Sequence, residues 1–371
     1  MNHWKYVKLG DVCAVERGGS PRPIDDFITS DKNGINWIKI GDADESMYIT
    51  KTAQKIKPEG MKKSRYVKPG DFLLSNSMSF GRPYILKIDG CIHDGWLVLR
   101  DENNTFDKKF LYYYLSAPIT YDKFKSMAVG GVVNNLNSEM VRRIRVPILS
   151  IEEQQQISNI LDKASGLISL RKQQLSKLDE LVKARFVEMF GEPVSNPMGW
   201  KRVRFDSISE NLDSKRVPVT ESDRKDGIYP YYGASGIVDW INDYIFDEDI
   251  LLVSEDGANL LIRSTPIAFS VSGKSWVNNH AHVVRFHDFA TQKFIEVYFS
   301  LIDISEYITG TAQPKLNQAK LNAMLFCWPP LALQNQFAVF VERVDQQKQT
   351  VQQSLEKLEL MKKALMQEYF G

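Results

Sequence analysis

Several loops of this 371-residue chain are rich in residue types that contact nucleic acid. Arginine, asparagine, glutamine and lysine can read base edges through paired hydrogen bonds, while serine hydroxyls and glycine amides suit phosphate oxygens. The candidate residues are Arg17, Ser20, Arg22, Lys39, Asn76, Ser77, Ser79, Arg82, Asn134, Asn135, Lys215, Arg216, Tyr231, Ser235, Asn259, Lys274, Asn278, Asn279, His280, Gln313 and Lys315. Each loop alone is more typical of an ordinary turn, where glycine, serine and asparagine are expected. The set is more informative, because several of the loops recur at matching places in the two halves of the chain.

Catalytic interpretations have weaker support. His280 and His282 are two residues apart with no third ligand nearby in the sequence, which argues against zinc. Glu255 and Asp256 could serve as a general acid–base pair, but a loop pair that accepts hydrogen bonds from cytosine or from the backbone is the preferred interpretation. There is no P-loop, no GxGxxG motif and no Asn/Asp-Pro-Pro-aromatic box. We therefore expect no catalytic residues, no metal and no cofactor in this chain.

Composition favours a soluble cytoplasmic protein. The three cysteines, Cys13, Cys91 and Cys327, lie far apart and form no CxxC motif, which is typical of reduced thiols. The N-terminus lacks the charged-then-apolar pattern of a signal peptide. The longest apolar runs, such as Ile250–Val253, are too short to span a bilayer, so we expect no association with membranes.

The net charge of +1 conceals an asymmetry between two parts of the chain. Residues 1–150 carry 23 Lys and Arg against 17 Asp and Glu, whereas residues 192–330 carry 13 against 18. A basic region suits a polyanion, but the acidic region does not indicate one. If residues 192–330 bind DNA, their basic side chains must gather on one face while the acids lie elsewhere.

The chain contains an internal repeat, most evident where two long stretches align at a constant offset without a gap. Its matched positions are Gly130 with Gly310, Leu136-Asn137 with Leu316-Asn317, and Leu175, Lys177, Leu178, Lys183-Ala184, Glu188 and Phe190-Gly191 with Leu355, Lys357, Leu358, Lys363-Ala364, Glu368 and Phe370-Gly371. The start of the unit, Trp4–Val12, resembles Trp200–Ile208 at a slightly larger offset. A middle match, Asp71–Ser75 with Asp249–Val253, could arise by chance. Two copies predict a chain that imitates a two-fold dimer.

The ends of both repeats predict long helices. Residues 152–189 contain almost no helix breakers, and about 38 helical residues would span ~57 Å. The apolar positions with heptad-like 4-3 spacing are Ile157, Leu161, Ala164, Ile168, Leu175, Leu178 and Val182, and then Phe337, Val341, Val344, Val351, Leu355, Leu358 and Leu365. This seam predicts an antiparallel coiled coil, although each helix could instead pack only on its own domain. Arg171 and Lys348 fall in the seam and should weaken or pin it.

Breakers delimit these helices. Pro147 and Pro329-Pro330 precede them and can stop the preceding strands, while Gly191 and Gly371 stand where a helix C-terminus favours glycine. The remaining segments contain strand-like runs at 35–40, 71–74, 95–99 and 250–253, with short helices expected at 110–116 and 294–300. The predicted fold is α+β: a head at 1–150, a long helix at 151–191, a second head at 192–330 and a second long helix at 331–371.

Several motifs together resemble those of a known family. They are the openings Trp4–Val12 and Trp200–Ile208, then Gly18–Pro21, Gly34–Trp37, Gly41-Asp42, Tyr232–Val238, Glu255–Asn259, Val277–Val283 and Pro147–Gln154. The corresponding segment Pro329–Gln336 lacks the two glutamates of Pro147–Gln154. Over essentially its whole length the chain resembles the specificity subunit (HsdS) of type I restriction–modification systems.

The resemblance implies two target-recognition heads, each reading one half of a split and asymmetric site on double-stranded DNA. The two helices would set the unread spacer and dock two modification subunits, which bind S-adenosylmethionine and methylate a flipped adenine. Two restriction subunits using ATP and Mg²⁺ would join where a nuclease is present. Two other interpretations remain open from the sequence: a self-sufficient nuclease or methyltransferase, which the missing cofactor motifs disfavour, and a coiled-coil assembly protein without a DNA role.

Overall fold

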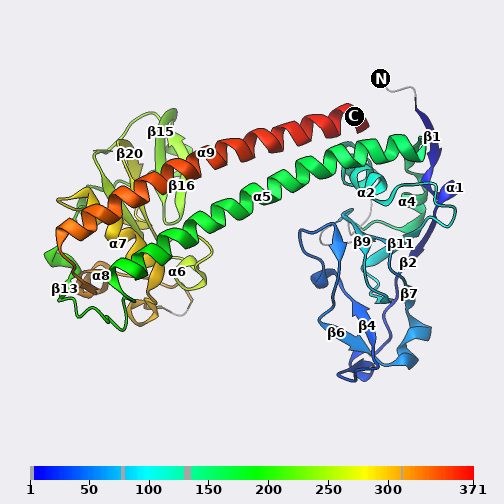
Figure 1. Cartoon of the computed structure of the whole chain (residues 1–371), viewed down its shortest axis with the longest axis horizontal. Coiled ribbons are helices and arrows are strands. Elements are labelled where there is room, and N and C mark those ends of the chain that lie inside the picture. The colour runs from blue at the N-terminus through cyan, green and yellow to red at the C-terminus, as the bar shows by residue number, and fades with distance from the viewer. Residues whose placement is uncertain (1–3, 77–79, 129–134, 311) are drawn as a thin grey trace. The chain divides into compact units, whose positions relative to one another are not determined.

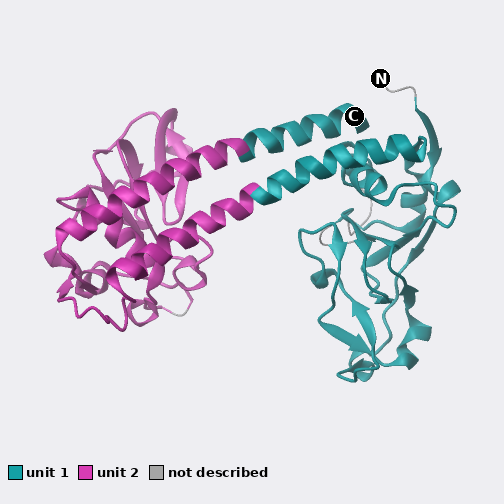
Figure 2. Ribbon diagram, in the orientation of Figure 1, with its two compact units in different colours: residues 1–170, 355–371 teal, residues 171–354 magenta. Residues whose placement is uncertain are grey.

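The computed structural model describes residues 4–76, 80–128, 135–310 and 312–371. The chain divides into two compact units, residues 1–170 with 355–371 and residues 171–354 (Figure 2). Each unit therefore contains one head together with a part of both long helices, labelled α5 and α9 in Figure 1. Three predictions on DNA contact, Ser77, Ser79 and Asn134, lie outside the described residues.

The first unit contains two five-stranded sheets, ordered β3-β6-β4-β10-β7 and β2-β11-β8-β9-β5, and a β1-β12 pair. The strands are β1 (Lys5–Lys8), β2 (Ala14–Arg17), β3 (Ile28–Thr29), β4 (Ile35–Ile38), β5 (Tyr48–Ile49), β6 (Gln54–Ile56), β7 (Arg65–Val67), β8 (Phe72–Ser75), β9 (Pro83–Leu86), β10 (Gly90–Ile92), β11 (Trp96–Arg100) and β12 (Arg145–Ile148). The helices of this head are α1 (Leu9–Val12), α2 (Lys108–Ser116), α3 (Pro118–Ala128) and α4 (Ser138–Arg143).

The second unit contains two four-stranded sheets, ordered β14-β21-β18-β19 and β16-β15-β20-β17, and a β13-β22 pair. The strands are β13 (Arg202–Arg204), β14 (Glu210–Asn211), β15 (Asp226–Gly233), β16 (Gly236–Ile241), β17 (Phe246–Asp247), β18 (Ile250–Ser254), β19 (Ala268–Val271), β20 (Lys274–Val277), β21 (Ala281–Arg285) and β22 (Leu325–Cys327). The helices of this head are α6 (Asn259–Ile262), α7 (Phe289–Leu301) and α8 (Gln318–Ala323).

The two heads share one strand plan, which confirms the duplicated α+β fold. In the first head β10 pairs parallel to β4 and antiparallel to β7, and in the second β20 pairs parallel to β15 and antiparallel to β17. Strands β8 and β18 each lie between two antiparallel neighbours. The repeat is also visible at α4 and α8, where Asn137 and Asn317 cap the helices through their side-chain oxygens.

The middle repeat match is real, but its predicted register is wrong by one residue. Ser75 pairs with Trp96 and Ser254 pairs with Ala281, so Ser75 is equivalent to Ser254 and not to Val253. A slip of one residue moves every side chain of a strand to the opposite face of its sheet. In the structural register, Phe72 and Leu251 both face the core that the head forms with the long helices.

Helices α5 (Ile151–Phe190) and α9 (Leu331–Phe370) have equal length. The internal repeat of the sequence aligns the first residue of α5 with the first residue of α9, and the last with the last. A capping box begins α5, since Ser150 and Glu153 bond reciprocally through side chain and backbone. Gly191 ends it with a positive φ of 80°, as the sequence predicted. The prediction that Pro147 stops the preceding strand is wrong, because Pro147 pairs with Tyr6 inside β12.

Within the second unit the two helices pack antiparallel. Phe186 lies 5.5 Å from Phe337, and Asp179, earlier in α5, bonds to Lys348, later in α9. In the first unit, Asp162 of α5 bonds to the Tyr113 hydroxyl while Lys362 of α9 lies over the Tyr113 ring. The interpretation in which each helix packs only on its own domain is therefore wrong.

Most predicted seam positions are buried. They are Ile157, Leu161, Ala164, Leu178, Val182, Phe337, Val341, Val344, Val351 and Leu355, while Ile168, Leu175, Leu358 and Leu365 are half-buried. The two charged seam residues differ in their partners. Lys348 forms an ion pair of 2.6 Å with Asp179. The Nε of Arg171 is buried without a hydrogen-bond partner among the described residues, which should weaken the seam locally.

Each head also packs on a helix end. In the first unit Phe370, the last residue of α9, contacts Phe110 and Tyr114 of α2. In the second unit Phe190, the last residue of α5, contacts Phe294 of α7 at 4.9 Å. These contacts explain why the Phe-Gly end of the helix is retained in both repeats.

Candidate nucleic-acid interface

The strand ends of the first head converge on the loop between β10 and β11. The amide of His93 bonds to the carbonyl of Ile38 at the end of β4, and the amide of Asn76 after β8 bonds to the carbonyl of Gly95. The segment before α4 joins them, because Leu136 donates its amide to the carbonyl of Asn76. Residues remote in sequence therefore meet at one place.

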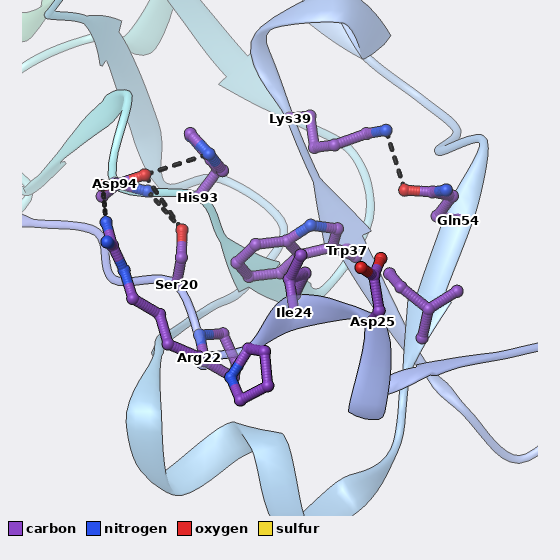
Figure 3. A pocket seen from close by; sticks show the side chains of 12 residues that line it. Ser20, Arg22, Ile24, Asp25, Trp37, Lys39, Gln54, His93 and Asp94 are labelled. Carbon is purple, nitrogen blue, oxygen red and sulfur yellow. Dashed lines mark hydrogen bonds and ion pairs between the residues drawn. The ribbon is translucent and has the colours of Figure 1, made fainter.

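A hollow of about 810 Å³ opens beside this loop (Figure 3). It is lined by Ser20, Pro21, Arg22, Pro23, Ile24, Asp25, Ile28, Trp37, Lys39, Gln54, His93 and Asp94. Three of the predicted contact residues, Ser20, Arg22 and Lys39, thus share one cavity. Lys39 Nζ is held by Gln54 Oε1 at 2.8 Å, and the buried Trp37 ring meets His93 edge-on.

Asp94 organises the polar side of this hollow. Its carboxylate accepts the Ser20 hydroxyl at 2.9 Å, lies 3.0 Å from His93 Nε2 and forms an ion pair with Arg22 at 3.6 Å. Its backbone carbonyl accepts Arg17 Nε at 3.2 Å. Burial raises the pKa of Asp94, but the Ser20 hydrogen bond and the nearby His93 and Arg17 outweigh burial, so the pKa is lowered. The carboxylate thus remains charged at neutral pH beside two exposed arginines.

The second head repeats these main-chain bonds with different side chains. The amide of Asn278 after β20 bonds to the carbonyl of Tyr232, and the amide of Glu255 after β18 bonds to the carbonyl of His280. Leu316 donates its amide to the carbonyl of Glu255, as Leu136 does to Asn76 in the first head. The loop at 278–280 is therefore equivalent to the loop at 93–95.

A charged cluster lies under this second site. Glu255, which is 9% exposed, binds Arg216 at 2.6 Å and Lys315 at 3.1 Å. His282 Nδ1 lies 2.6 Å from Asp213, whose other oxygen accepts the Val283 amide. Burial raises the pKa of Glu255, but hydrogen bonds from Arg216 and Lys315 outweigh it and the pKa is lowered. The pKa of Asp213 is lowered in the same way, since the bond to His282 outweighs burial.

Asp213, Glu255 and His282 place ligand atoms within 4.8 Å of one another. The expectation that His282 has no further ligand nearby is therefore wrong, because Asp213 and Glu255 approach it from distant parts of the sequence. The cluster nevertheless does not fit a metal. Both ring nitrogens of His282 are already engaged, Nδ1 by Asp213 and Nε2 by the carbonyl of Leu316, so neither is free to bind a metal ion. Arg216 and Lys315 already neutralise the carboxylates.

The predicted contact residues fall into four groups. Those exposed at or beside the converging loops are Arg17, Arg22, Asn135, Lys215, Ser235, Asn279, His280, Gln313 and Lys315. Half-buried ones are Ser20, Lys39 and Arg82, whose guanidinium covers the Tyr84 ring. Those committed to the fold are Asn76, Tyr231, Asn278 and Arg216, which are buried or ion-paired, and Asn259, which closes the turn to Thr265. The side chains of this third group hold the fold together and are therefore not available to read bases.

Lys274 forms the fourth group. It begins β20, whereas Asn278 follows the end of this strand, so the two lie roughly 13 Å apart along it. Its ammonium group lies over the Tyr244 and Tyr229 rings. Lys274 therefore does not join the converging loops.

Comparison with known proteins places this geometry in a family. The family model for the type I restriction modification DNA specificity domain matches residues 1–180 and 197–360. The chain belongs to this family. It is 32% identical over 143 residues to a Haemophilus influenzae protein named as a putative type I restriction enzyme specificity subunit, covering 38% of this chain and 36% of that protein. It is 22% identical to the MjaIX specificity subunit of Methanocaldococcus jannaschii, covering 91% and 86%.

Solved structures agree on the fold. The S subunit of a type I restriction–modification system from M. genitalium superposes with a TM-score of 0.59 at 13% identity, covering 100% of this chain and 96% of that one. The recognition of the specificity family from sequence motifs is confirmed. Over the described residues, none of the helices has the length and apolarity that crossing a membrane requires.

For a member of the specificity family, the acidic second head has an unexpected arrangement. The expectation that its acids lie away from its basic contact residues is wrong. Glu255 binds Lys315 at 3.1 Å, and Asp256 lies 3.0 Å from His280, so acids adjoin the exposed candidate residues themselves. Sequence reasoning also missed His93, Asp94 and Asp213, because most of their partners are distant in sequence and no local motif marks them.

Proposed function

We propose that this chain reads a bipartite, asymmetric target on double-stranded DNA, with one half-site for each head. The observation that carries the proposal is the equivalence of the two loop sites. The same main-chain bonds hold His93–Gly95 in one head and Asn278–His280 in the other, with different side chains at each position. Identical scaffolds with unlike side chains are what two different readers require, since base-edge hydrogen bonds carry the sequence information.

We also propose that the long helices dock two modification subunits. Leu181 of α5 and Met361 of α9 are equivalent in the repeat, and both are 46% exposed. Apolar residues exposed at equivalent places suit two copies of one partner. The seam residues Ile157, Leu161, Ile168, Leu175, Leu178, Val341, Val344, Val351, Leu355 and Leu358 would hold the two helices together beneath such partners.

In this proposal the chain has no catalytic group or cofactor of its own and works in the cytoplasm. S-adenosylmethionine belongs to the modification subunit, and ATP and Mg²⁺ belong to restriction subunits where these are present. The purified chain with S-adenosylmethionine should methylate no DNA, whereas methylation should appear once the modification subunit is added. Methyl transfer by the chain alone would contradict the proposal.

Exchange of one head is the decisive experiment. Residues 192–330 are replaced by the equivalent head of another family member, and the chain is produced with its modification subunit. Sequencing of methylated DNA then reports the target. We expect one half-site to change while the other half-site and the spacer stay the same. A change in both halves would show that the heads do not read independently.

A further inference from the structure

The two loop sites differ by an exchange of one carboxylate and one amide. The residue after β8 is Asn76, and its equivalent after β18 is Glu255. The residue two positions before β11 is Asp94, and its equivalent before β21 is Asn279. In the first head the side chain of Asn76 also donates through Nδ2 to the carbonyl of Asp94 at 2.8 Å, so the two positions are in contact.

The carboxylate residue binds the cations in both heads, although it lies in a different loop in each: between β10 and β11 in the first head and after β18 in the second. In the first head Asp94 contacts Arg17 through its carbonyl and Arg22 through its carboxylate. The Arg22 side chain is 83% exposed, so a ligand can reach it. In the second head Glu255 contacts Arg216 and Lys315; Arg216 is 14% exposed and Lys315 is 50% exposed.

The negative charges of Asp94 and Glu255 oppose the binding of a polyanion, so their presence in a DNA-binding site requires another role. Phosphate contacts dominate the affinity of proteins for DNA, and a nearby carboxylate opposes them. An arginine, however, distinguishes guanine only when its planar guanidinium is held in the correct orientation. A carboxylate that holds an exposed cation therefore lowers general affinity and increases discrimination.

We propose that Asp94 in the first head and Glu255 in the second are positioning residues for base recognition, Asp94 orienting Arg22 and Glu255 orienting Lys315. The carboxylate is the second member of the pair Asn76 and Asp94 but the first member of the equivalent pair Glu255 and Asn279. The cations that it orients therefore lie on different loops in the two heads. This difference in the position of the cations is one cause of the difference between the two half-sites. This inference rests on the proposed function of the heads.

The test uses the chain assembled with its modification subunit. Binding is measured over a series of salt concentrations for two duplexes of equal length. One carries the target sequence that the complex methylates, and the other has a random sequence. Asp94→Asn removes one negative charge, so binding to the random duplex should strengthen. Binding to the target should weaken, and the specificity ratio should fall about tenfold, the loss expected when one bidentate contact becomes disordered. The loss of selectivity should affect only the half-site of the first head.

Asp25→Asn is the matched control. Asp25 is an exposed carboxylate that lines the same hollow. Its replacement should strengthen binding to both duplexes alike and leave the specificity ratio unchanged. Asp94→Glu keeps the charge and should restore part of the ratio. Glu255→Gln should reproduce the Asp94→Asn effect at the half-site of the second head.

The outcomes separate this inference from the proposed function. If the unaltered complex prefers the target but Asp94→Asn leaves the ratio unchanged, the positioning role is refuted. If the unaltered complex shows no preference at any salt concentration, the proposed function itself fails. If Asp94→Asn also lowers the unfolding temperature, Asp94→Glu decides the matter. When Asp94→Glu lowers the unfolding temperature equally but restores the specificity ratio, the positioning role is supported. When it does not restore the ratio, the positioning role is refuted.

Discussion

At the scale of single residues, buried polar side chains fix the start of each long helix. Gln154 is fully buried, and its amide bonds to Asp107 N, Thr105 O and Leu149 O. Gln334, the equivalent residue of the second repeat, is also fully buried and bonds to the carbonyl of Pro329 at 2.9 Å. The structure thus aligns Gln154 with Gln334, as the constant offset of the repeat predicted, whereas the comparison of the two motifs paired Gln154 with Gln336.

Gln154→Ala should destabilise the chain. It removes three hydrogen bonds and leaves buried backbone groups unpaired, and each such group costs about 1–3 kcal/mol. We expect the free energy of unfolding in urea to fall by about 3 kcal/mol. The control is Gln155→Ala at an exposed neighbouring position, where the change should stay within about 0.5 kcal/mol. Equal effects of the two substitutions would contradict a role for Gln154.

The buried acids of the second head predict a loss of stability in acid. The pKa values of Asp213 and Glu255 are lowered in the folded chain from ordinary values of 3.8 and 4.5. A carboxyl with a lowered folded pKa stabilises the fold above its unfolded pKa, and this contribution is lost as the pH falls through the folded pKa. The free energy of unfolding should therefore decrease below about pH 4.5.

Urea titrations followed by tryptophan fluorescence, from about pH 7 to about pH 3, measure this dependence. Glu255→Gln should make the decrease shallower, because one of the linked protons is then absent. Glu221→Gln, at an exposed carboxylate of the same head, should retain the full dependence. If both variants showed the same pH dependence of the free energy of unfolding as the unaltered chain, Asp213 and Glu255 would not be the cause of the loss of stability in acid.

At the scale of elements, the helix ends are structural parts of the heads. Phe370 is 3% exposed and lies 5.7 Å from Phe110 in α2, although the two are far apart in sequence. Phe190 is also 3% exposed and lies against Phe294 in α7. Each head is therefore completed by the last turn of a helix, and in the first head this turn comes from the other end of the chain.

Phe370→Ala should loosen the first head selectively. Truncation of a buried phenylalanine costs about 3–5 kcal/mol. We expect faster hydrogen exchange in α2 with little change in α7, and Phe190→Ala should show the reverse pattern. Glu368→Ala, on an exposed face of the same turn, should leave both helices protected. Equal exchange of α2 and α7 in both phenylalanine variants would contradict the assignment of each end to one head.

At the scale of the whole molecule, the repeat places constant and variable features in different parts. The helices have the same length and equivalent bounds in the two repeats, whereas the heads differ in strand number and in charge. Helices that are the same in both repeats suit the binding of two identical partners. Heads that differ between the repeats suit the recognition of two different DNA half-sites. The exposed pair Leu181 and Met361 is the feature of this frame that the proposed modification subunits would cover.

The length of the helices should set the spacer of the target. Seven residues inserted at the middle of both α5 and α9 keep the seam in phase and add about 10.5 Å of helix. Because DNA rises about 3.4 Å per base pair, we expect the unread spacer to lengthen by about three base pairs. Sequencing of methylated DNA measures this directly. Altered half-sites, or an unchanged spacer, would refute the role of the helices as a ruler.

The sequence predicted the elements well where the signal is local and periodic. The heptad spacing of Leu161 and Val341 located both helices to within a residue or two at each end, and the short run Ile250–Val253 located β18. Local sequence patterns failed where the pairing of strands decides where a strand ends or in which register it lies. Pro147 continues its strand because it pairs with Tyr6, and the β8–β18 match slipped by one residue, since similar apolar letters occur on both faces of a buried strand.

By itself, the sequence determined the duplication, the helices, the two-headed plan and the family, because repeats, periodicity and motifs are properties of residue order. Only the tertiary structure decided which candidate residues can reach a ligand. Arg22 and Tyr231 were equal candidates, yet one is exposed beside Asp94 and the other is 1% exposed. The partners of Asp94 and Glu255 lie up to 77 residues away. Contacts over such separations depend on how strands register in a sheet, which no local pattern encodes.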